Sequence, residues 1–433
     1  MTQSATSSPG RVPQIDLMRI LAITGVVVIH SISATQPATS VIAAGFLMLT
    51  HANRDVFFLL TAFVLQYTAA TAPPGSFWRR RYPLVLVPYL CWSLLYVVVS
   101  GDLGGSPGAA FSTLGKDLAL GWWHLYFLVV TMQFYAVFPA LAWLLRRTTG
   151  RGHLILLVGA AGFELAETTL LQYHFGLPTA FLKPWSTVFQ ALLPSHVFWF
   201  VAGVVACVHV HELRSWLACH RRTVVWLVAL AVVAAEAVYF TGLAAGLPTV
   251  AAASPAQPVI LLTGVAAVLA LWVVGDRLLE TKPVQGRFWR GVAFCSDISF
   301  GVFLVHVLIL VWLVVPLERM TGIAGPGFVS ALVAITAVLV VSAVIAVLGR
   351  KTPLSLVLTG RPRRPHESDR PPIPRRALIA DAVRSDDGQM SRSNWWQRGR
   401  RLLVLATTVF IVVAPLVVRA ALYNFERPHG GPG

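Results

Sequence analysis

Residues 15–33 have the sequence IDLMRILAITGVVVIHSIS, which is about the length of apolar chain that crosses a bilayer as an α-helix. Besides Asp16 at its start, two ionisable side chains interrupt it, Arg19 and His30. At about 100° per residue, an eleven-residue step returns to within roughly 20° of the starting direction and rises about 16 Å. Both side chains therefore project from one helix face, and such a polar stripe in a membrane helix usually faces a cavity or a partner. The alternative is that Arg19 reaches the headgroups and pairs with Asp16, leaving His30 as an ordinary interior histidine.

The rest of the chain shares this apolar character. Of its 433 residues, 56% are hydrophobic and only 12% are charged, which is too apolar for a soluble protein of this size. We predict an all-α polytopic membrane bundle of ten helices followed by an eleventh, C-terminal transmembrane helix. The predicted spans are residues 15–33, 54–71, 82–100, 122–145, 154–172, 194–210, 224–244, 258–275, 294–315, 327–348 and 402–422. Residues 36–53 are predicted to form a surface loop.

The net charge of +16 is explained by topology. Arginine and lysine gather in every second connection, around residues 79–81, 146–151, 214–222 and 277–290, and again between 350 and 401. By the positive-inside rule these connections and the amino terminus are cytoplasmic, and an odd number of spans puts the carboxyl terminus outside the cell membrane. This placement favours contact with membrane lipids and argues against nucleic-acid binding.

Composition divides the chain into five parts. We expect a polar segment over 1–14, a membrane domain over 15–348, a disordered basic cytoplasmic linker over 349–401, the last helix over 402–422 and an extracytoplasmic tail over 423–433. The linker prediction rests on a stretch rich in Pro, Arg, Ser and Asp.

The cysteines predict neither disulfides nor a metal centre. Three of the four, Cys207, Cys219 and Cys295, map to the cytoplasmic side, where thiols stay reduced. Cys207 and Cys219 lie near His209, His211 and His220, but the gaps between these residues do not reproduce a zinc-finger spacing.

Five stretches occur in the order that is typical of one family. They are Asp16-Leu17-Met18-Arg19 with His30; Arg54-Asp55-Val56-Phe57-Phe58 running to Phe63; Trp78-Arg79-Arg80-Arg81-Tyr82 with Pro88-Tyr89; His124-Leu125-Tyr126-Phe127-Leu128; and Ser299-Phe300-Gly301-Val302-Phe303-Leu304-Val305-His306. Together they resemble the acyltransferase-3 family of integral membrane O-acyltransferases.

The chain departs from the pattern of that family in three places. Thr61-Ala62 stands where Ser-Gly is usual, and Phe300 and Phe303 replace two tyrosines. Some relatives also carry an eleventh helix that delivers a secreted esterase-like domain, whereas here only a short tail follows the last predicted helix.

The resemblance implies transfer of an acyl group, commonly acetyl, from cytoplasmic acyl-CoA to a hydroxyl of a cell-surface carbohydrate, a lipid or a secondary metabolite. Acyl-CoA would be a co-substrate, and no permanently bound cofactor is expected. An attacking hydroxyl must lose its proton, and a neutral imidazole is the usual base, which makes His30 the candidate. His30 as an acyl carrier is the rival role, and the sequence does not separate the two.

Other residues receive supporting roles. Arg19 is expected to bind a phosphate or the oxyanion, and Arg79 and Arg81 match an Arg-x-Arg motif that would hold the CoA phosphates. Plain positive-inside topology is the alternative for the basic run. Together with His30, Arg19 and His306 are the catalytic candidates. The supporting residues are Asp16, which would hold Arg19, Asp55, which would orient a histidine, His124, for which an aromatic belt is the alternative, and Ser299.

Two other classes of function remain open. A transporter or flippase would use the same intramembrane polar residues as a substrate or proton path, and it would need no contact with acyl-CoA. A scaffold would recruit partners through the linker, so that deletion of 350–401 would matter more than loss of His30.

Overall fold

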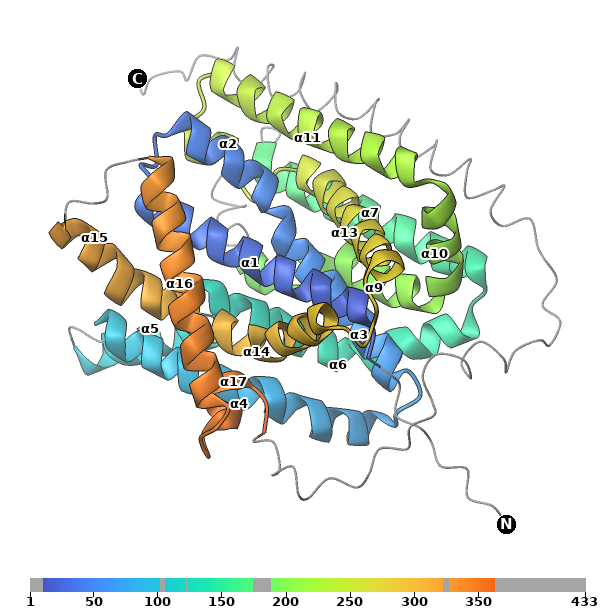
Figure 1. Ribbon diagram of the computed structural model, residues 1–433, viewed down its shortest axis with the longest axis horizontal. Coiled ribbons are helices and arrows are strands. Elements are labelled where there is room, and N and C mark those ends of the chain that lie inside the picture. The colour runs from blue at the N-terminus through green and yellow to red at the C-terminus, as the bar shows by residue number, and fades with distance from the viewer. Residues whose placement is uncertain (1–10, 102–105, 122, 174–187, 322–326, 363–433) are drawn as a thin grey trace. The chain divides into compact units, whose positions relative to one another are not determined.

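The computed structural model describes residues 11–101, 106–121, 123–173, 188–321 and 327–362, and every regular element in these ranges is helical. Contacts within the chain place Pro13–Arg363 in one compact unit, whose helices are drawn in colour in Figure 1. The first elements are α1 (Pro13–Thr35), α2 (Val41–Thr50), α3 (Ala52–Ala69), α4 (Pro74–Ser100), α5 (Pro107–Leu120), η1 (Trp123–Leu125), α6 (Tyr126–Arg147) and α7 (Gly150–Tyr173). The later ones are η2 (Phe189–Ala191), η3 (Leu193–His196), α9 (Val197–Val208), α10 (Val210–Cys219), α11 (Arg221–Ala244), α12 (Thr249–Ala252), α13 (Val259–Thr281), α14 (Arg287–Ile309), the π-helical turn η4 (Leu310–Val314), α15 (Val315–Thr321), α16 (Phe328–Gly349) and α17 (Ser355–Thr359).

Eight segments in the described ranges are long and apolar enough to cross a membrane. They are α1, α4, η1 with α6, α7, α11, α13, α14 continued to Leu317, and α16. A ninth follows if Leu193–Val208 and α10, which are bent by 88° at their junction, count as one span. The all-α membrane fold is therefore confirmed. The count of ten spans is not, because α3 begins with the polar run Asn53-Arg54-Asp55 and is not among the candidates. The predicted span 402–422 lies outside the described residues.

The predicted loop at 36–53 is wrong over most of its length, because Val41–Thr50 forms helix α2. The Ser40 hydroxyl caps this helix by accepting a hydrogen bond from the Ala43 N–H at 3.3 Å. Met48 is fully buried, and the Tyr239 hydroxyl of α11 donates to the Val41 carbonyl at 2.8 Å. A short apolar stretch with a serine cap can thus pack as a helix even though it is too short to span a bilayer.

The described chain continues past residue 349 into the range assigned to the linker. The short helix α17 packs on α4, where the Trp92 Nε1–H donates to the Val357 carbonyl at 3.0 Å. Just after it, Arg361 forms an ion pair with Asp297 of α14 at 2.7 Å. Residues 363–401 lie outside the described residues.

The first helix lies inside the bundle rather than at its edge, with α3, α14 and α16 packed around it (Figure 1). Met18, Ala22 and Val27 are fully buried along it. Another close approach joins α3 and α9 at Gly203, where an added Cβ would lie 2.3 Å from the Leu59 carbonyl oxygen. Glycine is therefore required where α9 crosses α3.

Candidate functional site

Arg19 and His30 both face α14. The Arg19 Nη1 donates to the Ser296 hydroxyl at 3.4 Å, and the His30 ring lies 5.3 Å from the His306 ring, centroid to centroid. Ten residues separate the two partners on α14, against eleven on α1, so the two helices run parallel and meet at two levels. The predicted polar stripe on one helix face is therefore present, and its partner is a second helix.

Three imidazoles meet at the level where His30 contacts His306. We call His30, His124 and His306 the histidine cluster. The His124 ring lies 4.9 Å from that of His306 and 6.1 Å from that of His30. His306 is fully buried and His124 is 2% exposed, whereas His30 is partly exposed. A reactant thus reaches His30 more readily than either of the other two rings.

Hydrogen bonding fixes the tautomer of His306. Its Nδ1 lies 2.7 Å from the Phe303 carbonyl oxygen, which only accepts, so Nδ1 carries the proton. The Nε2 atom is then a lone-pair acceptor, and it is buried with no hydrogen-bond partner in the part of the chain that the structure describes. Both nitrogens of His124 are likewise buried without a hydrogen-bond partner among the described residues. In its tautomer, the His306 imidazole offers Nε2 as a hydrogen-bond acceptor.

A strained turn presents His124 to the cluster. Trp123 has a φ of 41°, and Gly121 has a φ of 82° and would place a Cβ 2.3 Å from the Tyr126 nitrogen. A positive φ at a bulky residue costs free energy and persists only where surrounding packing holds it. The His124 side chain is therefore held in place by the fold around η1 rather than by local preference.

Aromatic rings close one side of the histidine cluster. The Phe303 ring lies 5.2 Å from that of His124 and 5.6 Å from that of Phe127, and Phe57 contacts both phenylalanines. The replacement of a family tyrosine by Phe303 therefore places an apolar ring directly against the imidazoles. This wall excludes water from that side.

Asp16 and Ser299 lie with Arg19, one level away from the cluster. The Ser296 hydroxyl donates to Asp16 at 2.6 Å, and the carboxylate of Asp16 lies 4.0 Å from the Arg19 guanidinium. Ser299 donates to the Ser296 carbonyl at 2.8 Å. The expected Asp16–Arg19 pair is present, and Ser296 joins it to α14.

Asp55 is placed differently from the expectation that it would orient a histidine. Its Oδ1 accepts from the Nε–H of Arg54 at 3.0 Å, and in the described residues no hydrogen bond joins it to a histidine. Because the partner is its own neighbour in sequence, the pair keeps a guanidinium and a carboxylate together inside the bundle.

Two glutamates that matched no motif form a polar network with the start of α9. Glu164 Oε2 accepts from the Phe198 N–H at 2.9 Å, and Glu167 Oε1 accepts from the Ser195 hydroxyl at 2.6 Å. A carboxylate at a helix N-terminus satisfies an N–H group that has no partner within the helix and interacts favourably with the helix dipole. Sequence reasoning missed this role because each partner lies some thirty residues away.

The basic run at the start of α4 has its arginines on different faces. Arg79 and Arg80 are exposed, whereas Arg81 is partly buried and donates from Nη2 to the Thr68 hydroxyl at 2.5 Å. A cavity of about 190 Å³ lies at the same end of α3. Its lining includes Ala70, Phe77, Phe138, Trp143 and Arg146.

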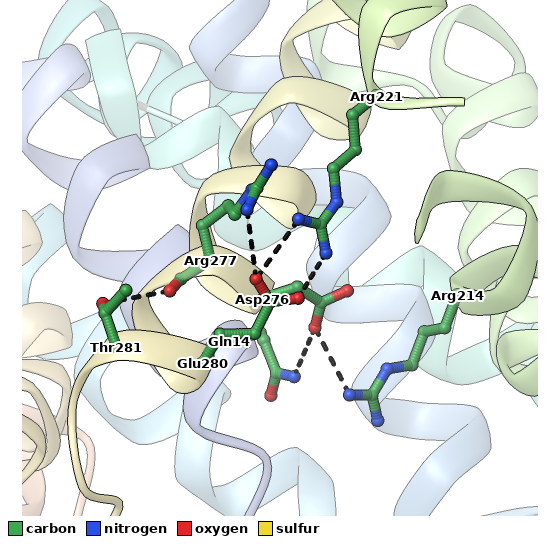
Figure 2. A network of polar contacts seen from close by, with 7 residues as sticks. All are labelled: Gln14, Arg214, Arg221, Asp276, Arg277, Glu280 and Thr281. Atoms are coloured by element: carbon green, nitrogen blue, oxygen red, sulfur yellow. Dashed lines mark hydrogen bonds and ion pairs between the residues drawn. The ribbon is translucent and has the colours of Figure 1, made fainter. Parts of the chain in front are cut away.

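Basic and acidic side chains tie the helices together at the end where α1 begins. Figure 2 shows Asp276 accepting from Gln14 at 2.9 Å and from Arg214 at 3.3 Å, with Glu280 beside Arg221 and Arg277. The network joins α1, α10, α11 and α13. Clustered arginines at this end fit the predicted cytoplasmic side.

In the described part of the chain, no three His, Cys, Asp or Glu side chains gather closely enough to hold a metal ion, and this includes those around α10. His209 instead shares a hydrogen bond of 2.9 Å with His153 of α7, and the other nitrogen of His153 contacts the Leu145 carbonyl. All four cysteines are free.

Fold and site together define a helical membrane protein with a cluster of imidazoles buried between its first helix and a later one. The chain belongs to the acyltransferase-3 family, whose model, described as an acyltransferase domain, matches residues 12–348. The match covers the five motifs and supports a membrane acyltransferase. No curated protein and no solved structure matches the chain.

Proposed function

We propose that this chain transfers an acyl group, most simply acetyl, from cytoplasmic acyl-CoA to a hydroxyl of a carbohydrate, lipid or secondary metabolite, with His30 at the reacting centre. The observation that carries the proposal is the histidine cluster, in which one partly exposed imidazole lies against a buried one that has an open acceptor nitrogen. Family membership supplies the reaction class.

In the base mechanism, His30 removes the proton from the acceptor hydroxyl as its oxygen attacks the thioester carbonyl. The carbon–oxygen bond forms, the carbon–sulfur bond breaks, and the proton passes to the departing thiolate to give free CoA. The His306 ring lies beside that of His30, and its Nε2 would serve as the hydrogen-bond acceptor that orients the His30 ring.

In the carrier mechanism, a nitrogen of His30 attacks the thioester and forms an acyl-imidazole, releasing CoA. The acceptor hydroxyl then attacks that acyl group and regenerates the imidazole. Mass spectrometry of the peptide containing His30 after rapid mixing with labelled acetyl-CoA separates the two mechanisms. Label on His30 supports the carrier, and its absence during turnover supports the base.

Arg19 is assigned to the phosphate end of the co-substrate rather than to the oxyanion. It lies about 16 Å along the helix from His30, which is too far to contact a carbonyl under attack there. Its place beside Ser296 and Asp16 leaves it 23% exposed. Arg81 and Arg79 serve the same end, so that the extended arm of CoA would run from the cytoplasmic surface to the histidine cluster.

The test uses the full-length protein in detergent with acetyl-CoA and a panel of hydroxyl acceptors, and it measures released CoA thiol. We expect acceptor-dependent release, and we expect His30→Ala to abolish it. The matched control is His211→Ala, which removes an exposed imidazole on α10. Turnover that persists in His30→Ala removes His30 from the reaction. A wild-type protein that moves a substrate across vesicles without cleaving any thioester supports a transporter instead.

A further inference from the structure

The hydroxyl of Tyr96 is built into the backbone of the helix that carries His306. It donates to the Leu304 carbonyl at 2.8 Å and accepts from the Leu308 N–H at 3.2 Å. Residues 304 and 308 are four apart, and in an α-helix these two groups would bond to each other. The Tyr96 hydroxyl oxygen is thus hydrogen-bonded to both ends of one helical turn of α14, and His306 lies in the middle of that turn.

The geometry of α14 changes directly after this contact. The π-helical turn η4 begins at Leu310, and its Trp312 ring packs against the Tyr96 ring at 6.2 Å. Side chains that enter the hydrogen-bond ladder are a known cause of helix distortion, and π-turns often occur at functional sites. The change to π-helical geometry after α14 therefore occurs beside a side chain that can cause it, Tyr96 of α4.

Tyr96 also touches a second member of the histidine cluster. Its ring meets that of His124 edge to face, at 5.2 Å and 88°. Tyr96 is completely buried, and the neighbouring Trp92 fixes this part of α4 to α17. One side chain therefore contacts His124 through its ring and the His306 turn through its hydroxyl.

We propose that Tyr96 is a positioning residue that holds the His306 turn of α14 against His124, so that the Nε2 acceptor of His306 stays directed at the cluster. The inference rests on the proposed function for its kinetic consequence, whereas the backbone contact itself can be tested without turnover. Tyr96 makes no chemical contribution in this proposal, because it acts only through the helix.

The variant that isolates the hydroxyl is Tyr96→Phe, which keeps the ring against His124. We expect kcat for thioester turnover to fall by about 10- to 100-fold, because displacement of a catalytic group by about 1 Å has an effect of that size. The KM for acyl-CoA should stay unchanged, since Arg19 and Arg81 are not touched.

Tyr89→Phe is the matched control. Tyr89 lies seven positions earlier on the same helix, within roughly 20° of the same face, and is equally buried. Its hydroxyl donates to the Leu118 carbonyl at 2.7 Å, in α5 rather than α14. We expect kcat to stay near that of the unmodified protein. An equal loss of kcat in both variants, or a loss of less than about twofold in Tyr96→Phe, overturns the proposal.

Amide hydrogen exchange of the full-length protein provides a readout that needs no activity. Without the Tyr96 hydroxyl, the Leu308 N–H loses the partner seen here, so exchange over residues 305–309 should become faster in Tyr96→Phe and not in Tyr89→Phe. Unchanged exchange overturns the positioning role. If the protein turns over no acyl-CoA at all, the proposed function fails, and the exchange result alone decides the role of Tyr96.

Discussion

The Nδ1–H of His306 donates to the carbonyl oxygen of Phe303, 2.7 Å away and one turn earlier on α14. This bond sets both the tautomer and the direction of the ring. The Nε2 atom lies on the opposite side of the ring from this bond, and the ring itself lies beside those of His30 and His124.

His306→Gln should therefore lower kcat by about 100- to 10,000-fold, the range typical of a lost acid–base group. Glutamine preserves much of the volume but cannot carry a proton between reactants. Initial rates at saturating acetyl-CoA measure the effect, with the exposed His211→Gln as the control. A kcat close to that of the wild type would show that His306 serves packing alone.

Arg81→Ala should raise the KM for acyl-CoA by about tenfold, because a charge-assisted hydrogen bond contributes about 1.5–3 kcal/mol and 1.4 kcal/mol corresponds to a factor of ten. Arg79→Ala should have a smaller effect, since that side chain is exposed and more strongly screened. Steady-state kinetics with varied acetyl-CoA separates KM from kcat. Arg80→Ala is the control for general surface charge, and equal KM values in all three variants would argue against a specific phosphate contact.

Gly203→Ala should reduce stability by about 1–3 kcal/mol, the usual range for overpacking. The added methyl would meet the Leu59 carbonyl oxygen at 2.3 Å and the Ala62 Cβ at 2.7 Å, where α9 crosses α3. Thermal unfolding in detergent measures the change. Gly162→Ala in α7 is the matched control, because nothing lies within 4 Å of its added Cβ, and we expect no loss there. Similar melting temperatures for Gly203→Ala and wild type would show that α3 and α9 can move apart enough to accept the added methyl at no cost in stability.

Those parts of the fold that depend on local sequence were predictable. The direction of Arg19 relative to His30 follows from the helix repeat alone, and both side chains do face α14. Long apolar stretches likewise predicted the helical membrane fold. Helix α2 was missed because its apolar run is short. The Ser40 cap and the hydrogen bond from Tyr239 stabilise the helix despite its length.

The positions of His30, His124 and His306 in the sequence did not predict that their rings would meet. His124 enters the cluster through a turn with positive φ angles at Gly121 and Trp123, and no propensity favours Trp123 there. Glu164 accepts a hydrogen bond from the backbone of α9, and no pattern of side chains in the sequence predicts such a contact. Tertiary packing decides both cases, so resemblance to a family could name His124 but could not place it.

The parallel packing of α1 against α14 has a consequence for biogenesis. Arg19 lies in α1, yet its hydrogen-bond partner on α14, Ser296, is 277 positions further along the chain. While the residues between α1 and α14 are synthesised, Arg19 and His30 lack the surface of α14 that they contact in the folded protein. The two levels of polar contact between α1 and α14 can therefore form only after α14 has been made, so the order of synthesis delays assembly of the proposed site.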